Sequence, residues 1–277
     1  INIIYAVGLN LILGVAGQFS LGHAGFIAIG SYSGAILGKM INGLPGLFAG
    51  MAVGVVISVI VAFLVGLPTL RLKGDYLAIA TLGVAEIIRV AVTNMKITNG
   101  AAGISGIPLT NTWTITYIFL VVTTILILNY TFSSAGRATY GVLQDEIAAE
   151  SMGVQVTKYK ILAFVLGAAT ASIGGTLSAT TLGAVTPGDF TFMKSIDVLI
   201  IVVFGGIGSF TGSFVAAVLL GIINLVLQPF GQLRMIIYAV ALILIMIFRP
   251  GGLLGTWEFK LGNLKFSKKK EAKESGK

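Results

Sequence analysis

The feature that most constrains this chain is a series of long apolar runs separated by short polar breaks. The runs fall at about 1–16, 24–41, 47–70, 76–95, 113–132, 161–183, 195–207, 210–228 and 233–248. A helix needs about 20 mostly apolar residues to cross a bilayer. Several runs reach that length, and the short run at 195–207 is typical of a broken or re-entrant helix. The pattern predicts an all-α, polytopic transmembrane helix bundle with about nine spans or half-spans.

Composition supports a membrane location. Only 10% of the residues are charged, whereas a soluble domain carries about 25%. A soluble fold of this size would therefore lack the charged side chains that cover a surface in water. Cysteine is absent, which excludes disulfides and thiolate metal sites. We expect no metal site in this chain.

The two ends of the chain suggest its domain organisation. The sequence starts at Ile1, without Met and already inside an apolar run. We therefore expect a further N-terminal span, which would bring the full chain to ten spans. We expect a transmembrane domain over 1–255 and a basic tail over 256–277. A basic tail after an apolar span is typical of the cytoplasmic side, where anionic lipid attracts it. The net charge of +8 therefore indicates membrane lipid and not nucleic acid as a partner.

Basic residues in the loops predict the orientation of the spans. The segment 133–160 and the turn with Arg71 and Lys73 fall on the same side as the tail, whereas Lys39, Lys96 and Lys194 fall on the other. The bias agrees with the positive-inside rule but is incomplete.

Glycines are often spaced by four residues, as in Gly30, Gly34 and Gly38 or in Gly50 and Gly54. Small residues at this spacing allow helix backbones to approach closely in lipid. We therefore expect a compact bundle in which these glycines serve packing.

The segment 17–26 interrupts the apolar pattern with three glycines and with Gln18, Ser20 and His23. Such a break in a bundle is typical of a broken helix whose freed backbone groups face a cavity. The three polar side chains are candidates for the substrate path. The alternative is a tight interhelical contact with satisfied polar groups.

Glu86 and Arg89 are the next candidates for that path. They fall deep within the apolar run at 76–95, where an unpaired charge is costly. Their spacing of three residues lets them neutralise each other on a helix. The pair either holds the bundle together or borders the path.

The loop 133–160 is long for a chain whose other loops are short. Asp145 and Glu146 are suited to the start of a short helix and Gly153 to its end. Ile147, Ala148 and Met152 can share an apolar face, which is typical of an element that docks on a soluble partner. A helix lying on the membrane surface is the alternative, but such helices usually have a basic polar face.

Several motifs together resemble one family. The segment from Asp145 to Gly153 resembles the coupling loop of ABC importer permeases. GQFSLGHAGF (17–26), LKGDYLAIATLGVAEIIR (72–89), NGAAGISGIP (99–108) and VFGGIGSFTG (203–212) resemble the second permease subunit of branched-chain amino acid importers. The resemblance covers residues 4–255. It implies that Asp145, Glu146, Ala148, Ala149, Glu150 and Gly153 couple the chain to an ATPase.

The resemblance also implies an assembly in the plasma membrane of a bacterium or archaeon. A sister permease would complete a heterodimer, two cytoplasmic ATPase subunits would use ATP and Mg²⁺, and an extracytoplasmic binding protein would deliver the solute. The chain itself lacks a Gly-x-x-x-x-Gly-Lys-Ser/Thr loop for phosphates. We therefore expect a translocation subunit with no catalytic residues and no cofactor of its own.

Three other functions stay open. An ABC permease can carry urea, short amides or another amino acid. A stand-alone secondary transporter or channel needs an intramembrane relay of charged groups, and such groups are few here. A membrane enzyme is disfavoured because the chain has one histidine, no cysteine and no clustered carboxylates.

Overall fold

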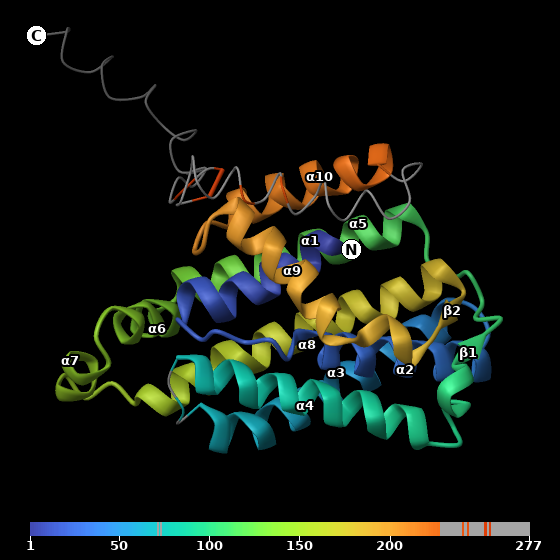
Figure 1. Cartoon of the computed structure of the whole chain (residues 1–277), viewed down its shortest axis with the longest axis horizontal. Coiled ribbons are helices and arrows are strands. Elements are labelled where there is room, and N and C mark those ends of the chain that lie inside the picture. Colours follow the sequence, from blue (N-terminus) through green and yellow to red (C-terminus); the bar gives the residue numbers. More distant parts are fainter. Residues whose placement is uncertain are drawn as a thin grey trace, which may run out of the picture.

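The computed structural model describes residues 1–70, 72 and 74–227, together with positions 240, 243, 252, 253 and 255. The described chain is a bundle of helices that run roughly along its long axis (Figure 1). A two-residue antiparallel ladder, in which Ile104 pairs with Val185, is its only sheet within these residues. The prediction of an all-α helix bundle is confirmed.

The helices and strands have the following bounds. They are α1 (Asn2–Asn10), a π-helix (Leu11–Val15), α2 (His23–Met40), α3 (Leu44–Thr69), α4 (Asp75–Asn94), a 3₁₀-helix η2 (Gly100–Ala102), β1 (Ile104–Ser105), α5 (Trp113–Phe132), α6 (Ser134–Gln144), α7 (Glu146–Ser151), α8 (Val156–Leu182), β2 (Ala184–Val185), a 3₁₀-helix η3 (Pro187–Phe190), α9 (Phe192–Gly205) and α10 (Phe210–Leu227).

Every apolar run within residues 1–227 forms a helix, but these helices differ in length. Four of them, α3, α4, α5 and α8, are long and apolar enough to cross a membrane. The helices α9 and α10 meet that test only as a pair, bent by 119°, which confirms the predicted break near 195–207. The predicted run at 233–248 and the tail at 256–277 lie outside the described residues, and the domain boundaries stay predictions.

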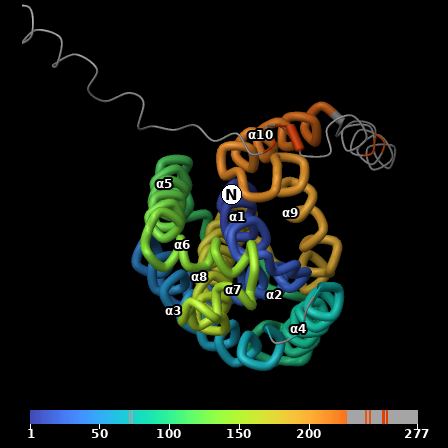
Figure 2. The backbone as a smooth tube through the Cα atoms, turned by 90° about the vertical axis from the view of Figure 1, so that its left-hand side faces the viewer, coloured from blue at the N-terminus to red at the C-terminus, as the bar shows by residue number. Residues whose placement is uncertain are grey.

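The helix α8 is the centre of the bundle. It packs mainly against α2 and α3, and Figure 2 shows it between α3 on one side and α2 on the other. In α8, 67% of the most apolar window is buried, against 28% in α3 and α4 and 11% in α5. A displacement of α8 would therefore disturb more of the molecule's packing than a displacement of the outer spans.

Glycines allow α2, α3 and α8 to lie close together. A Cβ atom built on Gly30 would lie 1.9 Å from the carbonyl oxygen of Ser172 in α8. One on Gly50 would lie 2.7 Å from the Cα atom of Gly34. Both distances are far below van der Waals contact, so only glycine fits. The predicted role in close packing is confirmed for Gly30, Gly34, Gly50 and Gly54, whereas Gly38 makes no such close approach among the described residues.

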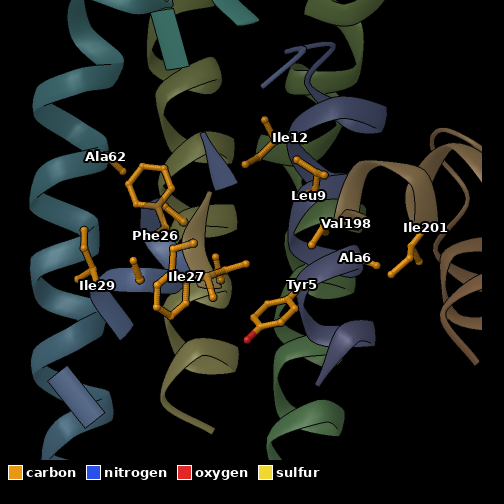
Figure 3. Close-up of a cluster of buried hydrophobic side chains, with 14 of the residues drawn as sticks. Tyr5, Ala6, Leu9, Ile12, Phe26, Ile27, Ile29, Ala62, Val198 and Ile201 are labelled. Carbon is orange, nitrogen blue, oxygen red and sulfur yellow. The ribbon is translucent and has the colours of Figure 1, made fainter. Parts of the chain in front are cut away.

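The core joins helices that are distant in the sequence. Figure 3 shows Tyr5 and Leu9 of α1, Phe26 of α2 and Val198 of α9 within one buried apolar cluster. Phe26 also meets Phe164 of α8 edge to face, with ring centroids 5.7 Å apart. This packing fixes α1 and the start of α2 against the central helix.

The two ends of the bundle carry different elements. The helices α6 and α7 lie at one end, and β1 and β2 lie at the other (Figure 1). Lys39 belongs to the second end, because its Nζ donates to the carbonyl oxygen of Ser105 in β1 at 2.9 Å. The segment 133–160 and Lys39 are therefore separated as expected, and the assignment of the α7 end to the cytoplasm stays a prediction.

Candidate functional site

The short helix α7 forms a projecting corner at one end of the bundle (Figure 1). Asp145 is its N-cap, and the side-chain Oδ1 accepts hydrogen bonds from the N–H groups of Ile147 at 2.9 Å and Ala148 at 3.1 Å. Gly153 has a positive φ of 81° just beyond the helix, a conformation that favours glycine. The predicted start and end of this helix are confirmed.

An ion pair holds α7 against the central helix. The ammonium group of Lys160, near the start of α8, donates to the carboxylate of Glu146. Lys160 is buried although it carries a charge, and a buried charge is stable only when it is paired. Glu146 therefore points inward and fixes α7 to α8.

The outward surface of α7 is apolar. Ile147 is 76% exposed and Met152 is 84% exposed, while Ala149 is buried against the bundle. Two large apolar side chains exposed on a helix outside the membrane-spanning elements are typical of a protein contact. Of the six residues predicted for coupling, Asp145, Ala148, Glu150 and Gly153 are exposed, whereas Glu146 and Ala149 face inward.

A cavity of about 870 Å³ lies beside this corner. Glu150, Gly153 and Lys158 line it from the α7–α8 connection. Phe63 of α3 and Ile161 of α8 supply apolar walls. The exposed residues of α7 and this cavity therefore lie next to each other at the same end of the bundle.

The segment 17–26 breaks the helical path as predicted. The π-helix ends at Val15, and α2 begins at His23. The backbone groups that the break frees are satisfied by side chains: Ala24 N–H donates to Ser195 Oγ at 2.9 Å, and Leu21 N–H donates to Thr81 Oγ1 at 3.1 Å. These two N–H groups are thus covered by α9 and α4, which favours the alternative of an interhelical contact at the start of α2.

The three polar side chains of this segment are all buried. Ser20 Oγ accepts from Gly22 N–H at 3.3 Å. The side-chain nitrogen and oxygen atoms of Gln18 and both ring nitrogens of His23 make no hydrogen bond of ordinary geometry among the described residues, although the imidazole of His23 interacts with the backbone of Tyr5. Because such groups are costly when left unpaired, Gln18 and His23 keep their candidacy for a polar ligand.

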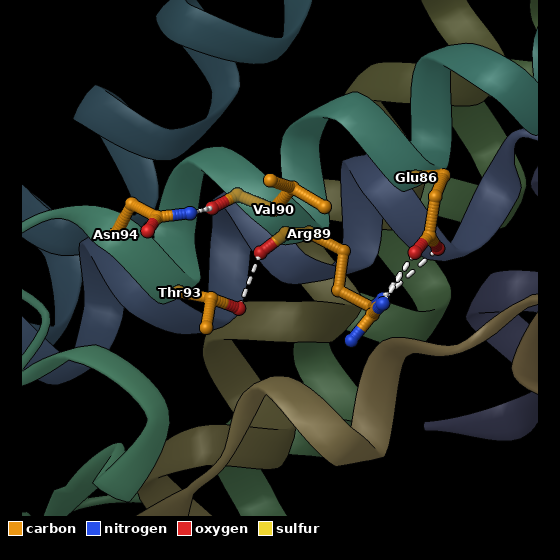
Figure 4. Close-up of polar contacts among 5 residues, drawn as sticks. All are labelled: Glu86, Arg89, Val90, Thr93 and Asn94. Carbon is orange, nitrogen blue, oxygen red and sulfur yellow. Dashed lines mark hydrogen bonds and ion pairs between the residues drawn. The ribbon is translucent and has the colours of Figure 1, made fainter.

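Glu86 and Arg89 form the predicted pair on α4. Arg89 Nε lies 3.0 Å and 2.9 Å from the two carboxylate oxygens of Glu86 (Figure 4). The side chain of Glu86 is 46% exposed and that of Arg89 is 29% exposed. The buried face of α4 packs against the start of α2, where Gly25 lies close to Ala85 of α4. The pair and the segment 17–26 thus lie on neighbouring elements, but within the described residues no hydrogen bond or ion pair joins their side chains.

A buried amide was missed in the sequence. Asn10 Nδ2 donates to the carbonyl oxygen of Ser209 at 2.8 Å and to Ser213 Oγ at 3.0 Å, and Asn10 Oδ1 accepts from Gly208 N–H at 2.9 Å. This amide fixes the glycine-rich turn between α9 and α10 to α1. The sequence feature that could have revealed it is a polar residue, Asn10, inside the apolar run at 1–16.

Comparison with known proteins decides the family. The family described as "Branched-chain amino acid transport system / permease component" matches residues 1–248. The chain belongs to this family. This permease is 37% identical to the high-affinity branched-chain amino acid transport system permease protein LivM of Salmonella typhimurium, over 92% of this chain and 68% of LivM.

Two further relatives show how widely the similarity extends. The permease is 24% identical to the branched-chain amino acid permease protein LivH of Escherichia coli, over 90% of both chains. It is 29% identical to the ribose import permease protein RbsC of Escherichia coli, over 88% of this chain and 80% of RbsC. No solved structure matches the chain. The multi-pass character and the permease family are thereby established.

Proposed function

We propose that this permease is the translocation subunit of an ABC importer for branched-chain amino acids in a bacterial inner membrane. The relatives named above are bacterial proteins, and LivM and LivH of Escherichia coli carry the name of one transport system. A sister permease would complete a heterodimer. Two ATPase subunits would supply ATP and Mg²⁺ chemistry, and an extracytoplasmic protein would deliver the solute.

The observation that carries this proposal is the projecting helix α7. It combines a satisfied N-cap at Asp145 with exposed Ile147 and Met152, which suits a knob that inserts into a groove of a soluble partner. Asp145 and Glu146 are already engaged within the chain. The apolar side chains, with Ala148 and Glu150 between them, would therefore supply most of the contact with the ATPase.

The path of coupling follows from the packing. Glu146 joins α7 to Lys160 of α8, and α8 packs against α2 and α3 at glycine contacts without spare space. Close-packed interiors transmit displacement instead of absorbing it. A push on α7 by an ATPase dimer would therefore move α8 and, through it, the broken segment that carries Gln18, Ser20 and His23.

Co-purification of the complete importer tests this proposal. Ile147→Asp places a charge in the expected apolar contact, so the ATPase subunits should no longer co-purify with the permease. Ile97→Asp is the matched control, because Ile97 is 65% exposed and follows α4 at the opposite end of the bundle. Retention of the ATPase by the Ile147 variant, or its absence from the unmodified complex, would contradict the proposal.

A second candidate keeps the importer class and changes the solute. The similarity to RbsC, a ribose import permease by name, extends over most of the chain, so the likeness does not by itself fix an amino acid as the cargo. Urea and short amides are further candidates. Uptake of radiolabelled leucine, ribose and urea by the same reconstituted complex separates them.

A further inference from the structure

Charge is unevenly distributed over the outer helices of the bundle. The helices α3 and α5 contain no charged residue, while α4 carries Glu86 and Arg89 well inside its length. Burial does not explain the difference, because the most apolar windows of α3 and α4 are both 28% buried. The exposed faces of α3 and α5 suit lipid, whereas α4 carries a partly exposed ion pair beside its exposed apolar residues.

The position of the ion pair makes this contrast sharper. Glu86 is the twelfth and Arg89 the fifteenth residue of the 20-residue helix α4, so neither belongs to its first or last turn. Both side chains are partly exposed although they are paired with each other. Charged groups at this depth in a membrane almost always face protein or a water-filled cavity. Something other than lipid must therefore cover this face.

A stripe of α4 beside the ion pair has the shape of a helix contact. Tyr76, Ile79, Ile87 and Val90 are exposed and follow a helical spacing of three, eight and three residues. Gly83 lies in the middle of this stripe, and a Cβ atom built on it would have no other heavy atom of the described residues within 4 Å. Nothing in the described part of the chain requires glycine there, and glycine weakens a helix. A second helix that approaches closely would require it.

Neighbouring elements extend this polar side of the bundle. The helix α9 carries Lys194, whose Nζ lies 5.8 Å from the centre of the Tyr5 ring, and an exposed Asp197. Figure 2 shows α4 and α9 on one side of the bundle and α3 and α5 on the opposite side. The charged residues of the described outer spans thus gather on one side.

We infer that the exposed face of α4, with Gly83 at its centre and the Glu86–Arg89 pair beside it, is the surface that contacts the sister permease subunit. This inference rests on the proposed function, which supplies that subunit. It adds which side of this chain meets the sister subunit and which side meets lipid. The ion pair would then lie at the seam between the two permeases, where a polar path can run.

Site-specific photo-crosslinking in the complete importer tests the inference. A benzophenone amino acid is placed at Ile87 on α4 or, as the matched control, at Ile125 on α5; both isoleucines are well exposed. Mass spectrometry should identify the sister permease in the adduct from Ile87 and no polypeptide in the adduct from Ile125. Lipid alone, a second copy of this chain or an ATPase subunit at Ile87 would overturn the inference.

A substitution provides a second readout. Gly83→Phe fills the space that the sister helix would occupy, so the sister permease should be lost from the purified complex, whereas Val122→Phe on α5 should leave it in place. Equal recovery with both variants would contradict the inference. Failure of the unmodified chain to co-purify with any second permease would instead contradict the proposed function, so the two failures are distinguishable.

Discussion

The buried ammonium group of Lys160 in α8 is paired with the carboxylate of Glu146 in α7, fourteen residues earlier in the sequence. This pair joins the helix that projects from the bundle to the helix at its centre. Because Glu146 remains about one-third exposed, the pair has access to solvent on one side. Its energetic value therefore lies nearer to that of a surface pair than to that of a fully buried one.

Glu146→Gln should loosen α7 without unfolding the bundle. We expect a loss of about 1 kcal/mol in the free energy that holds α7 against α8, which shifts the docked population by about fivefold. ATP-driven uptake by the reconstituted importer should fall, while basal ATP hydrolysis continues. Exchange of the two charges in Glu146→Lys with Lys160→Glu should restore part of the uptake. Unchanged uptake in the single variant would exclude a coupling role for the pair.

The N-cap of α7 allows its structural role to be separated from its charge. Asp145→Ala removes the acceptor for two backbone N–H groups and should cost about 1 kcal/mol of helix stability. Asp145→Asn keeps a good cap and removes the charge. Hydrogen exchange over residues 146–152 should rise in the first variant and stay low in the second. An equal rise of hydrogen exchange in both variants would show that the charge of Asp145, and not its capping hydrogen bonds, stabilises α7.

The contact at Gly30 should be intolerant of even one methyl group. Gly30→Ala drives a Cβ into the backbone oxygen of Ser172, and overpacking of this kind costs about 1–3 kcal/mol. A Cβ atom built on Gly38 of the same helix would have its nearest described neighbour at 3.9 Å, so Gly38→Ala should be neutral or stabilising by up to about 1 kcal/mol. Thermal unfolding in detergent should show opposite signs, and equal effects would contradict the packing described above.

Asn10 should be essential for the turn between α9 and α10. Asn10→Leu leaves the partly buried N–H of Gly208 without its side-chain acceptor, at a cost of about 1–3 kcal/mol, while the carbonyl oxygen of Ser209 keeps its hydrogen bonds from Ser213. Asn2→Leu is the control, because Asn2 belongs to the same helix but is exposed. A lower unfolding temperature is expected for the Asn10 variant only. The same temperature for both variants would show that the turn does not depend on this amide.

Local patterns in the sequence predicted local structure well. Asp145 and Gly153 marked the ends of α7 because capping depends on residues within one turn. The pair of Glu86 and Arg89 was predictable because residues three apart share a helix face. The short run at 195–207 indicated the break between α9 and α10, because the length of an apolar run can be read directly from the sequence.

Contacts between distant segments were not predictable. The glycine spacing indicated close packing, but not that Gly30 meets Ser172 of α8. The break at 17–26 was expected to leave backbone N–H groups free, and it is Ser195 and Thr81 that satisfy them. The ion pair of Glu146 with Lys160 was not expected, because the two residues lie fourteen positions apart, beyond the reach of helical periodicity. One sequence carries no record of such pairings.

ATP dependence of solute uptake tests the central claim most directly. The permease is reconstituted into proteoliposomes alone or with its sister permease, ATPase and binding-protein partners, and entry of radiolabelled leucine is followed with and without ATP. Uptake should require the complete complex and ATP, and Ile147→Asp should abolish it while leucine binding by the binding protein is unchanged. Leucine uptake by this chain alone in the absence of ATP would contradict the account.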